Sequence, residues 1–346
     1  MRSRRTAGIL ARVVLAGAWV LAAVPGGCSG SDDTGDVLLP GGRPVPTPDS
    51  PVPSAAPYLH LGWGSPPDPI AVMAATGIRA FTLAFVLSSG DCTPAWDGAR
   101  PLTGGGDERT IAAIREAGGD VVVSFGGWSG RKLGEDCASA ADLARAYQRV
   151  IDAYRLRAID VDLERTEFSD PVVQDRVMAA LRQIKRNNPA VQIIVTMGTE
   201  PAGPGAAGAR LVRRAAALGM PVDVWTIMPF DVGGPQTAGS MGALSARAST
   251  GLHEALRAAC PALSDAQVYR MQGISSMNGR TDHGEVVTPT DLREILAHAR
   301  AHRLARLTFW SVNRDRACGG GGAGDACSGI AQATWEFTRI IAAYPG

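Results

Sequence analysis

The sequence lacks the charge imbalance and the metal-binding patterns that mark several classes of protein. Its 346 residues include 34 Lys and Arg against 33 Asp and Glu, which gives a formal net charge of +1 at pH 7. This balance provides no electrostatic reason to expect nucleic acid as a partner. No CxxC pair or His/Cys cluster suggests a metal site, and we expect neither a metal nor another cofactor.

A glycine-rich phosphate loop is also lacking, and the apolar run near the N-terminus is short. The segment GGGD at 104–107 does not match GxGxxG, so nothing indicates a dinucleotide-binding sheet. The apolar run at 13–24 is shorter than the ~20 residues that a membrane-spanning helix needs. Arg-rich residues precede the run and small residues follow it, so residues 1–28 are expected to be an export signal.

Cys28 ends this signal and precedes the polar stretch SGSDDTGD. The arrangement resembles a bacterial lipoprotein signal, in which the cysteine is lipidated and attaches the protein to the outer face of the cell membrane. The alternative is ordinary cleavage and release outside the cell. Residues 29–57 are rich in Pro, Gly, Ser and Asp without periodicity, which predicts a linker before a folded region at 58–346.

Five further cysteines follow the linker, and an exported protein meets conditions in which disulfides form. Cys318 and Cys327 bracket the segment GGGGAGDA and could close a small loop. Cys92 and Cys137 fall in loops after expected strands, so they could meet. Cys260 is the odd one and is expected to be a free thiol at the end of a helix.

Short apolar strands alternate with helical segments throughout the folded region. Eight such strands over about 290 residues predict a (β/α)8 TIM barrel that forms a single domain. The competing architecture is a doubly wound open sheet, which would usually carry the missing phosphate loop. The expected strands cover residues 58–63, 80–87, 120–127, 158–164, 192–199, 222–230, 267–276 and 306–312.

The segment RAIDVDLERTE at 157–167 places three carboxylates at alternating positions of one expected strand. Asp160, Asp162 and Glu164 are each two residues apart, so they share one face, while the apolar residues between them face the helices. The structural alternative is a wet surface or pairing with a neighbouring Arg. Enclosure of three carboxylates in a barrel is costly, and it is tolerated mainly where the groups shift one another's pKa for function. We therefore interpret the row as catalytic.

Polar and aromatic side chains follow several of the other expected strands. In such barrels the C-terminal strand ends meet at one mouth, where the chemistry takes place. These ends carry SFGGW at 124–128, MPFD at 228–231 and WSVNRD at 310–315, and the first strand ends at Trp63. This distribution suits a sugar-binding cleft.

Together these motifs resemble glycoside hydrolase family 18, the chitinases and related enzymes. AIDVDLE is similar to the DxDxE signature on the family's fourth strand, and SFGGW is similar to its SxGG motif on strand three. MPFD resembles the M-x-[YF]-D motif of strand six, and FWSVNRD resembles the strand-eight segment with the family's Trp. The resemblance covers residues 58–346. It implies a monomeric catalytic domain that acts on chitin or N-acetylglucosamine oligosaccharides.

The resemblance also implies a substrate-assisted mechanism that retains the anomeric configuration. Glu164 would protonate the glycosidic oxygen and later act as a base toward water. Asp162 would orient the substrate's 2-acetamido group, whose oxygen attacks the anomeric carbon. Asp160 would share a proton or hydrogen bond with Asp162.

Further residues of the resemblance would bind the sugar. Trp310 would form the floor on which the sugar stacks, and Asp231 would hydrogen-bond the sugar or its acetamido group. The tyrosine of the strand-six motif is Phe230 here, so the hydroxyl that contacts the acetamido oxygen in many members is missing, and Asn278 or Tyr269 could replace it. The other expected site positions are Met228, Gly126, Gly127 and Trp63.

Three other functions are open at this point. The same barrel could act as an endo-N-acetylglucosaminidase on glycoprotein glycans or cell-wall material. It could be a sugar-binding lectin, although inactive relatives typically lose the acid that Glu164 supplies. A structural cell-surface lipoprotein would leave the acid row without a role.

Overall fold

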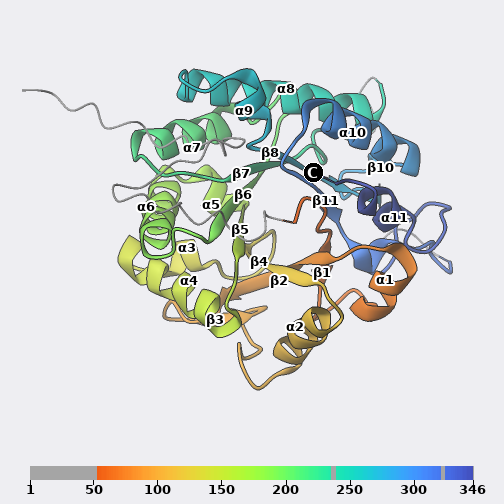
Figure 1. The fold of residues 1–346 in the computed structure, drawn as a ribbon, viewed down its shortest axis with the longest axis horizontal. Helices are drawn as coiled ribbons and strands as arrows, with labels where there is room; N and C mark the ends of the chain where they lie inside the picture. The colour runs from red at the N-terminus through yellow and green to blue at the C-terminus, as the bar shows by residue number, and fades with distance from the viewer. Residues whose placement is uncertain (1–52, 235–238, 321–323, 346) are drawn as a thin grey trace, which may run out of the picture.

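The computed structural model describes residues 53–234, 239–320 and 324–345, and the expected export signal with Cys28 lies outside them. Within this part, eight parallel strands form a ring with helices around its outside (Figure 1). The predicted (β/α)8 barrel is therefore confirmed. Its strands, in their order around the sheet, are β1 (Tyr58–His60), β2 (Ala80–Ser88), β4 (Asp120–Gly126), β5 (Ala158–Leu163), β6 (Gln192–Gly198), β7 (Val224–Met228), β8 (Gln272–Met277) and β11 (Arg306–Trp310).

The ring nearly closes between β11 and the segment just before β1. Ala55 forms a parallel bridge with Leu307, whose backbone N–H donates to the Ser54 carbonyl at 2.7 Å. The Ala56 carbonyl accepts hydrogen bonds from the hydroxyls of Thr82 and Thr308, at 2.8 and 2.7 Å. Residues 54–57 were expected in the linker, but they take part in the barrel because their backbone completes its hydrogen bonding.

Helices follow the strands and begin at recognisable capping residues. Asp170 accepts from the Val172 N–H, with Pro171 at the first helical position. Thr288 and Asp291 form a capping box. The helices are α1 (Pro69–Thr76), α2 (Gly106–Glu116), α3 (Leu133–Asp136), α4 (Ala140–Tyr154), α5 (Arg165–Ser169), α6 (Pro171–Asn187), α7 (Gly205–Ala217), α8 (Met241–Ala259), α9 (Asp265–Tyr269), α10 (Pro289–His302) and α11 (Glu336–Ala342). Short elements complete the described chain: β3 (Pro94–Trp96), β9 (Gly279–Arg280), β10 (Val286–Val287) and the 3-10 turn η1 (Val312–Arg314).

The seventh barrel strand begins later than the sequence pattern predicts. Residues 267–269 were expected in the strand, but they lie in α9 because Ser264 and Gln267 form a capping box that starts a helical turn. Tyr269 consequently lies outside the barrel, where its ring stacks on His253 at a centroid distance of 4.1 Å. The suggestion that Tyr269 supplies the missing hydroxyl is therefore wrong.

The wall of the barrel has an apolar outer face and a divided inner face. Ile159, Val161 and Leu163 of β5 are fully buried in the main core with residues of the surrounding helices. A separate apolar cluster lies on the inner face, toward the N-terminal strand ends, and is formed by Val122, Ala158, Ile194 and Val224. Asp160 and Asp162 follow Ala158 on that inner face, so the bottom of the barrel interior is apolar and the acids lie nearer the C-terminal strand ends.

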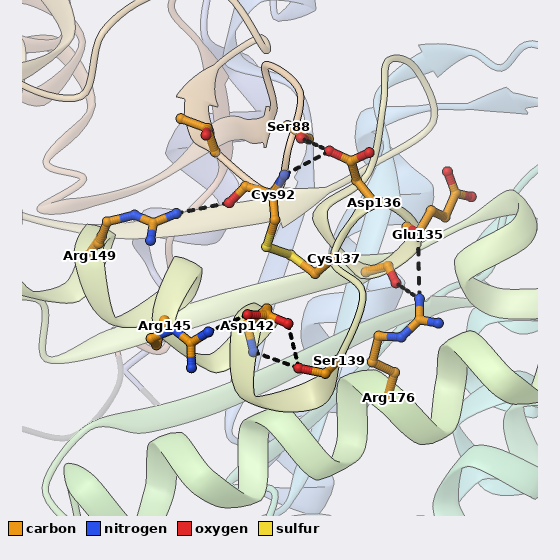
Figure 2. The surroundings of a disulfide bond; sticks show 12 residues. Ser88, Cys92, Glu135, Asp136, Cys137, Ser139, Asp142, Arg145, Arg149 and Arg176 are labelled. Carbon is orange, nitrogen blue, oxygen red and sulfur yellow. Dashed lines mark hydrogen bonds and ion pairs between the residues drawn. A yellow bond between two sulfur atoms is a disulfide. The ribbon is translucent and has the colours of Figure 1, made fainter.

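Two predicted disulfides are present, and the prediction for Cys260 is wrong. Cys92 and Cys137 are bonded, with Cα atoms 4.6 Å apart, and so are Cys318 and Cys327, at 5.1 Å. Figure 2 shows Asp136 beside the first bond, where its carboxylate accepts from the Ser88 hydroxyl and the Cys92 N–H. Cys260 also takes part in a disulfide, so it is not a free thiol.

Among the described residues, no helix is both long and apolar enough to cross a membrane.

Loss of the Cys92–Cys137 bond should destabilise the protein more than loss of the Cys318–Cys327 bond. The bonds join positions 45 and 9 residues apart, for which loop-closure entropy gives about 4 and about 2.5 kcal/mol. We expect the paired alanine substitution of Cys92 and Cys137 to lower the free energy of unfolding in urea by the larger amount. The paired alanine variant of Cys318 and Cys327 is the matched control, and an equal or reversed order would contradict the expectation.

Candidate active site

A pocket of about 740 Å³ opens at the C-terminal ends of the barrel strands. Most of the residues expected at the site from the sequence line it: Trp63, Asp162, Glu164, Met228, Phe230, Asp231 and Trp310. Asp160, Gly126, Gly127 and Asn278 do not line it but lie next to residues that do. The pocket therefore brings the strand-end motifs together as the barrel prediction required.

Asp160 lies on the inner face of β5 and is held by three hydroxyl groups. Tyr58 and Ser124 donate to its Oδ2 at 2.8 and 2.6 Å, and Thr196 donates to its Oδ1 at 2.6 Å. Burial raises the pKa of Tyr58 well above its usual value, and Asp160 raises it further, so Tyr58 keeps its proton and stays a donor. Three hydroxyl donors therefore hold the fully buried Asp160 side chain in one position at the inner end of the row.

Asp162 is buried next in the row, and its Oδ1 has no hydrogen-bond partner among the described residues. Burial raises its pKa well above the usual range, and the charges of Glu164 and Asp160 raise it further. Asp162 is thus disposed to hold a proton. Because an unpartnered buried oxygen is costly, this side chain is ready for a hydrogen bond from a bound molecule.

Glu164 follows β5 at the pocket, where it can exchange protons near neutral pH. Burial raises its pKa to about 7, and the charges of Asp231 and Asp282 add to this rise while Lys132 and Arg165 oppose it. A carboxyl group with such a pKa can both donate and accept a proton at neutral pH, as general acid–base catalysis requires.

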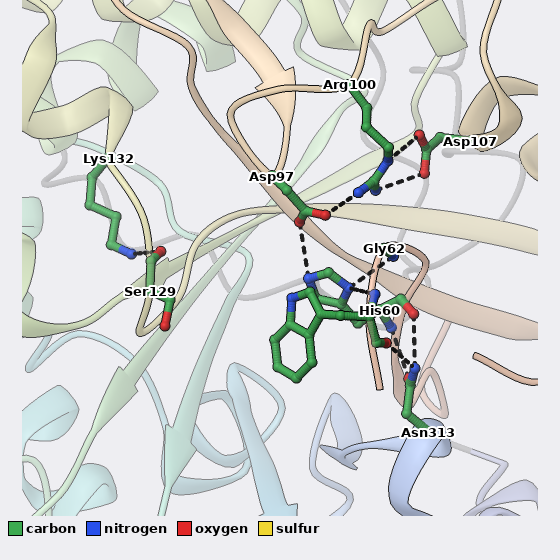
Figure 3. A network of polar contacts seen from close by, with 9 residues as sticks. His60, Gly62, Asp97, Arg100, Asp107, Ser129, Lys132 and Asn313 are labelled. Carbon is green, nitrogen blue, oxygen red and sulfur yellow. Dashed lines mark hydrogen bonds and ion pairs between the residues drawn. The ribbon is translucent and has the colours of Figure 1, made fainter. Parts of the chain in front are cut away.

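Lys132 and Glu167 lie behind the row and were not predicted from the sequence. The Lys132 side chain is only 2% exposed, and its ammonium donates to the Ser129 carbonyl (Figure 3). Glu167 is also buried; it accepts from the Gly134 N–H at 2.9 Å, and burial raises its pKa to about 8. The Lys132 charge acts on Asp162 and Glu164 from a segment about 30 residues earlier in the chain, and Glu167 reaches back to Gly134, so no local pattern reveals these contacts.

Gly126 and Gly127 bring the end of β4 close to β5. A Cβ on Gly126 would lie 2.2 Å from the Asp162 carbonyl oxygen, and one on Gly127 would lie 2.6 Å from the Phe85 ring. Both residues have left-handed backbone, with φ of +94° and +80°. The Gly127 N–H donates to the Asp162 carbonyl at 2.9 Å. The glycines therefore let the end of β4 pack closely against Asp162 and Phe85, next to the pocket.

Aromatic side chains form one wall of the pocket. Trp310 stacks on Phe85 at a centroid distance of 5.6 Å and lies 5.8 Å from Trp63. Trp128 is 59% exposed at the rim, with the Arg165 guanidinium 4.7 Å from its ring centroid. Trp96, in contrast, is fully buried in the core, where its indole N–H donates to the Tyr154 hydroxyl at 2.8 Å.

Asp231 lies in the loop after β7, which Glu285 holds in shape. The Glu285 carboxylate accepts backbone N–H bonds from Asp231, Val232 and Gly234, at 3.1, 3.0 and 3.0 Å. The Asp231 side chain accepts from the His283 N–H at 2.8 Å, and burial raises its pKa. Glu285 is more than 50 residues from this loop in sequence, so no local pattern could identify it.

Asn278 does not line the pocket, but its side-chain nitrogen is buried without a hydrogen-bond partner among the described residues. Its side-chain oxygen accepts from the Ser311 N–H at 3.0 Å, and its backbone N–H donates to the Trp310 carbonyl at 3.0 Å. Ser275 of β8 does line the pocket, and its buried hydroxyl has no partner among the described residues. Its position on the inner face of β8 could have been found from strand alternation.

Comparison with curated proteins shows similarity to chitinases that are longer than the matched region. The chain is 30% identical over 274 residues to the probable bifunctional chitinase/lysozyme of Escherichia coli (strain K12), which covers 75% of this chain and 30% of that protein. It is 29% identical over 272 residues to endochitinase 11 of Metarhizium anisopliae, which covers 75% of this chain and 52% of that protein. The chain thus spans about a third to a half of these relatives. No family model matches it.

Solved structures include a barrel of closely similar shape. The catalytic domain of the hyperthermophilic chitinase from Pyrococcus furiosus superposes with a TM-score of 0.77 and 27% identity, over 85% of this chain and 96% of that one. A family GH18 chitinase from Chromobacterium violaceum matches with a TM-score of 0.58 at 18% identity, over 87% of each chain. The second likeness shows the fold alone.

Replacement of Lys132 by methionine should raise the pKa of Glu164 above about 7, because the lysine charge favours the ionised carboxylate. The titration can be followed by NMR of protein labelled with 13C at the glutamate carboxyl carbons, with Glu164→Gln identifying the signal. Lys185→Met, on the outer helix α6, is the matched control and should leave the pKa of Glu164 unchanged. An unchanged midpoint in Lys132→Met would contradict the assigned charge interaction.

Proposed function

Because the chain belongs to glycoside hydrolase family 18, we propose that it is an exported chitinase that hydrolyses β-1,4 linkages between N-acetylglucosamine units in chitin or chitooligosaccharides. The observation that carries the proposal is the acid row of β5, in which Asp162 and Glu164 face the same pocket as Trp310. The chitinase names of the most similar proteins support this substrate class.

In the proposed reaction, Glu164 gives its proton to the glycosidic oxygen as the bond to the anomeric carbon breaks. The carbonyl oxygen of the substrate's own 2-acetamido group forms the new bond to that carbon, so no enzyme nucleophile is needed. The departing sugar leaves with the proton. Glu164, now ionised, takes a proton from the incoming water. The water attacks the anomeric carbon of the cyclic intermediate from the face that the departing sugar occupied. A pKa of about 7 suits both halves of this cycle.

Asp162 is proposed to hold the acetamido group while the new bond forms. Its free Oδ1 can accept the hydrogen bond of the acetamido N–H, which satisfies the buried oxygen and turns the carbonyl oxygen toward the anomeric carbon. Positive charge develops on the acetamido group, and a carboxylate beside it stabilises that charge. Asp160, fixed by its three hydroxyl donors, takes or shares the proton that Asp162 gives up.

Trp310 is proposed as the floor of the cleavage subsite, with the Phe85 ring stacked against it. The hydroxyl that Phe230 lacks can be supplied by Ser275, since its hydroxyl lines the pocket without a protein partner. Asp231 completes the polar side of the subsite. These roles are consistent with an N-acetylglucosamine ring, whose faces carry axial C–H groups that stack on an aromatic ring and whose equatorial polar groups lie around its edge.

Glu164→Gln should lower kcat on chitooligosaccharides by about 10²- to 10⁴-fold, because glutamine cannot transfer a proton. Product size and anomeric form can be followed by NMR during the first minutes, and the wild type should release the β anomer. Glu116→Gln, at an exposed position of α2, is the matched control. Full activity in Glu164→Gln or an initial α product would contradict the mechanism.

The same assay separates the alternative functions. A wild type that binds oligosaccharides without cleaving them would indicate a lectin, and cleavage only of glycoprotein glycans would indicate the endo-N-acetylglucosaminidase.

Export is proposed to depend on residues 1–28. In a bacterial host, the full chain should be found outside the cytoplasm, and deletion of residues 2–27 should retain it inside. Metabolic labelling with palmitate tests lipidation, which Cys28→Ala would abolish. Release of an unlabelled protein into the medium would support ordinary secretion instead, and cytoplasmic full-length chain would contradict export altogether.

A further inference from the structure

Trp63, at the rim of the pocket, is 39% exposed, yet its backbone is tightly held. It follows β1 in a turn whose N–H groups point back at His60. Its indole lies 4.2 Å from the His60 ring and 5.8 Å from the Trp310 ring, tilted by 54° to the latter. An exposed tryptophan with this orientation offers an apolar surface next to the floor of the cleavage subsite.

His60 fixes the turn through one ring nitrogen. Its Nδ1 accepts hydrogen bonds from the backbone N–H groups of Gly62 and Trp63, at 3.0 and 3.2 Å. A nitrogen that accepts two such bonds carries no proton, so the proton of the neutral ring is on Nε2. Nε2 lies 3.0 Å from the Asp97 carboxylate and donates to it (Figure 3). The contacts thus select one tautomer of a buried ring.

Asp97 is itself anchored by a second pair of charged residues. Its other carboxylate oxygen contacts Arg100, whose guanidinium also donates to Asp107 at 2.9 and 3.0 Å. Although burial raises the pKa of Asp97, hydrogen bonds from His60 and Arg100 outweigh this effect and lower it. This cluster packs directly on the turn, since a Cβ on Gly62 would lie 2.1 Å from both Arg100 and Asp97.

Asn313 holds the same turn from the opposite side. Its side-chain amide donates to the carbonyls of His60 and Trp63, at 2.9 and 3.0 Å, and its oxygen accepts from the His60 N–H at 3.0 Å. The backbone of Trp63 therefore has side-chain partners for both its N–H and its C=O, which hold it in place at the pocket rim.

We propose that His60, backed by Asp97, is a positioning residue that fixes Trp63 as a second sugar-binding platform beside Trp310. This rests on the proposed function, because it names the ligand as an N-acetylglucosamine oligomer of at least two rings. A platform that is rigid before binding loses little conformational freedom when the sugar stacks on it. His60 itself needs no contact with the substrate in this role.

Binding of chitotetraose to the Glu164→Gln protein, measured by calorimetry, tests the proposal without turnover. Trp63→Ala should weaken binding by about tenfold or more, as for a truncated aromatic anchor. His60→Gln keeps a donor near Nε2 but loses the acceptor at Nδ1, and we expect a loss of about fivefold to tenfold. His60→Asn keeps an acceptor near Nδ1 and should recover most of that loss.

The double variant His60→Gln/Trp63→Ala separates positioning from a merely structural role. If His60 acts through Trp63, the double variant should bind no more weakly than Trp63→Ala alone. An equal His60→Gln loss in the presence and absence of Trp63, or no recovery in His60→Asn, would overturn the proposal. If the Glu164→Gln protein binds chitotetraose while the wild type cleaves no oligosaccharide, the chitinase proposal fails and the positioning result still stands. If the Glu164→Gln protein does not bind chitotetraose, the chitinase proposal and the positioning proposal both fail.

Discussion

The two-residue period of β5 places carboxylates inside the barrel and apolar side chains against the helices, and the pocket depends on this division. A shift of one residue in the register of β5 would turn Ile159 and Val161 inward and expose the acids to the helix layer. The pairing of Ser124 with Asp160 across β4 and β5 fixes the register and also supplies a hydrogen bond to the acid. Fold and chemistry are therefore set by the same contact.

Burial of acidic groups lowers the stability of the ionised protein, and the surroundings offset this cost in different ways. Asp160 is satisfied by hydroxyl donors, whereas Asp162 and Glu164 have raised pKa values and the opposing charge of Lys132 nearby. Glu167 adds a further protonated carboxyl with a pKa of about 8. Between the pKa of such a group in the unfolded chain and its folded pKa of about 8, the folded state holds one more proton than the unfolded state. The free energy of unfolding therefore falls as the pH rises through this range. Several such groups in one site lower the stability of the folded protein near neutral pH, and the same raised pKa values suit the groups to proton transfer there.

The sequence was sufficient for the barrel, the acid row and the Cys318–Cys327 bond, because each depends on a short period or a local pattern, and it suggested the Cys92–Cys137 bond because both cysteines follow expected strands. It did not identify Lys132, Glu167 or Glu285, which act on residues far along the chain through folded contacts. The start of β8 was misjudged because a capping box at Ser264 outweighs the apolar alternation that follows it. Strand alternation alone also cannot show that Tyr269 lies outside the barrel, where its ring stacks on His253.

The pairing of Ser54 and Ala55 with Leu307 has a consequence for how the pocket is presented. Leu307 is at the start of β11 and Trp310 at its end, so the described chain enters the barrel at its base while the pocket opens at the other end. Whatever the preceding residues are attached to, they join the barrel at the end opposite the mouth. The described chain therefore leaves the mouth clear where it enters the barrel.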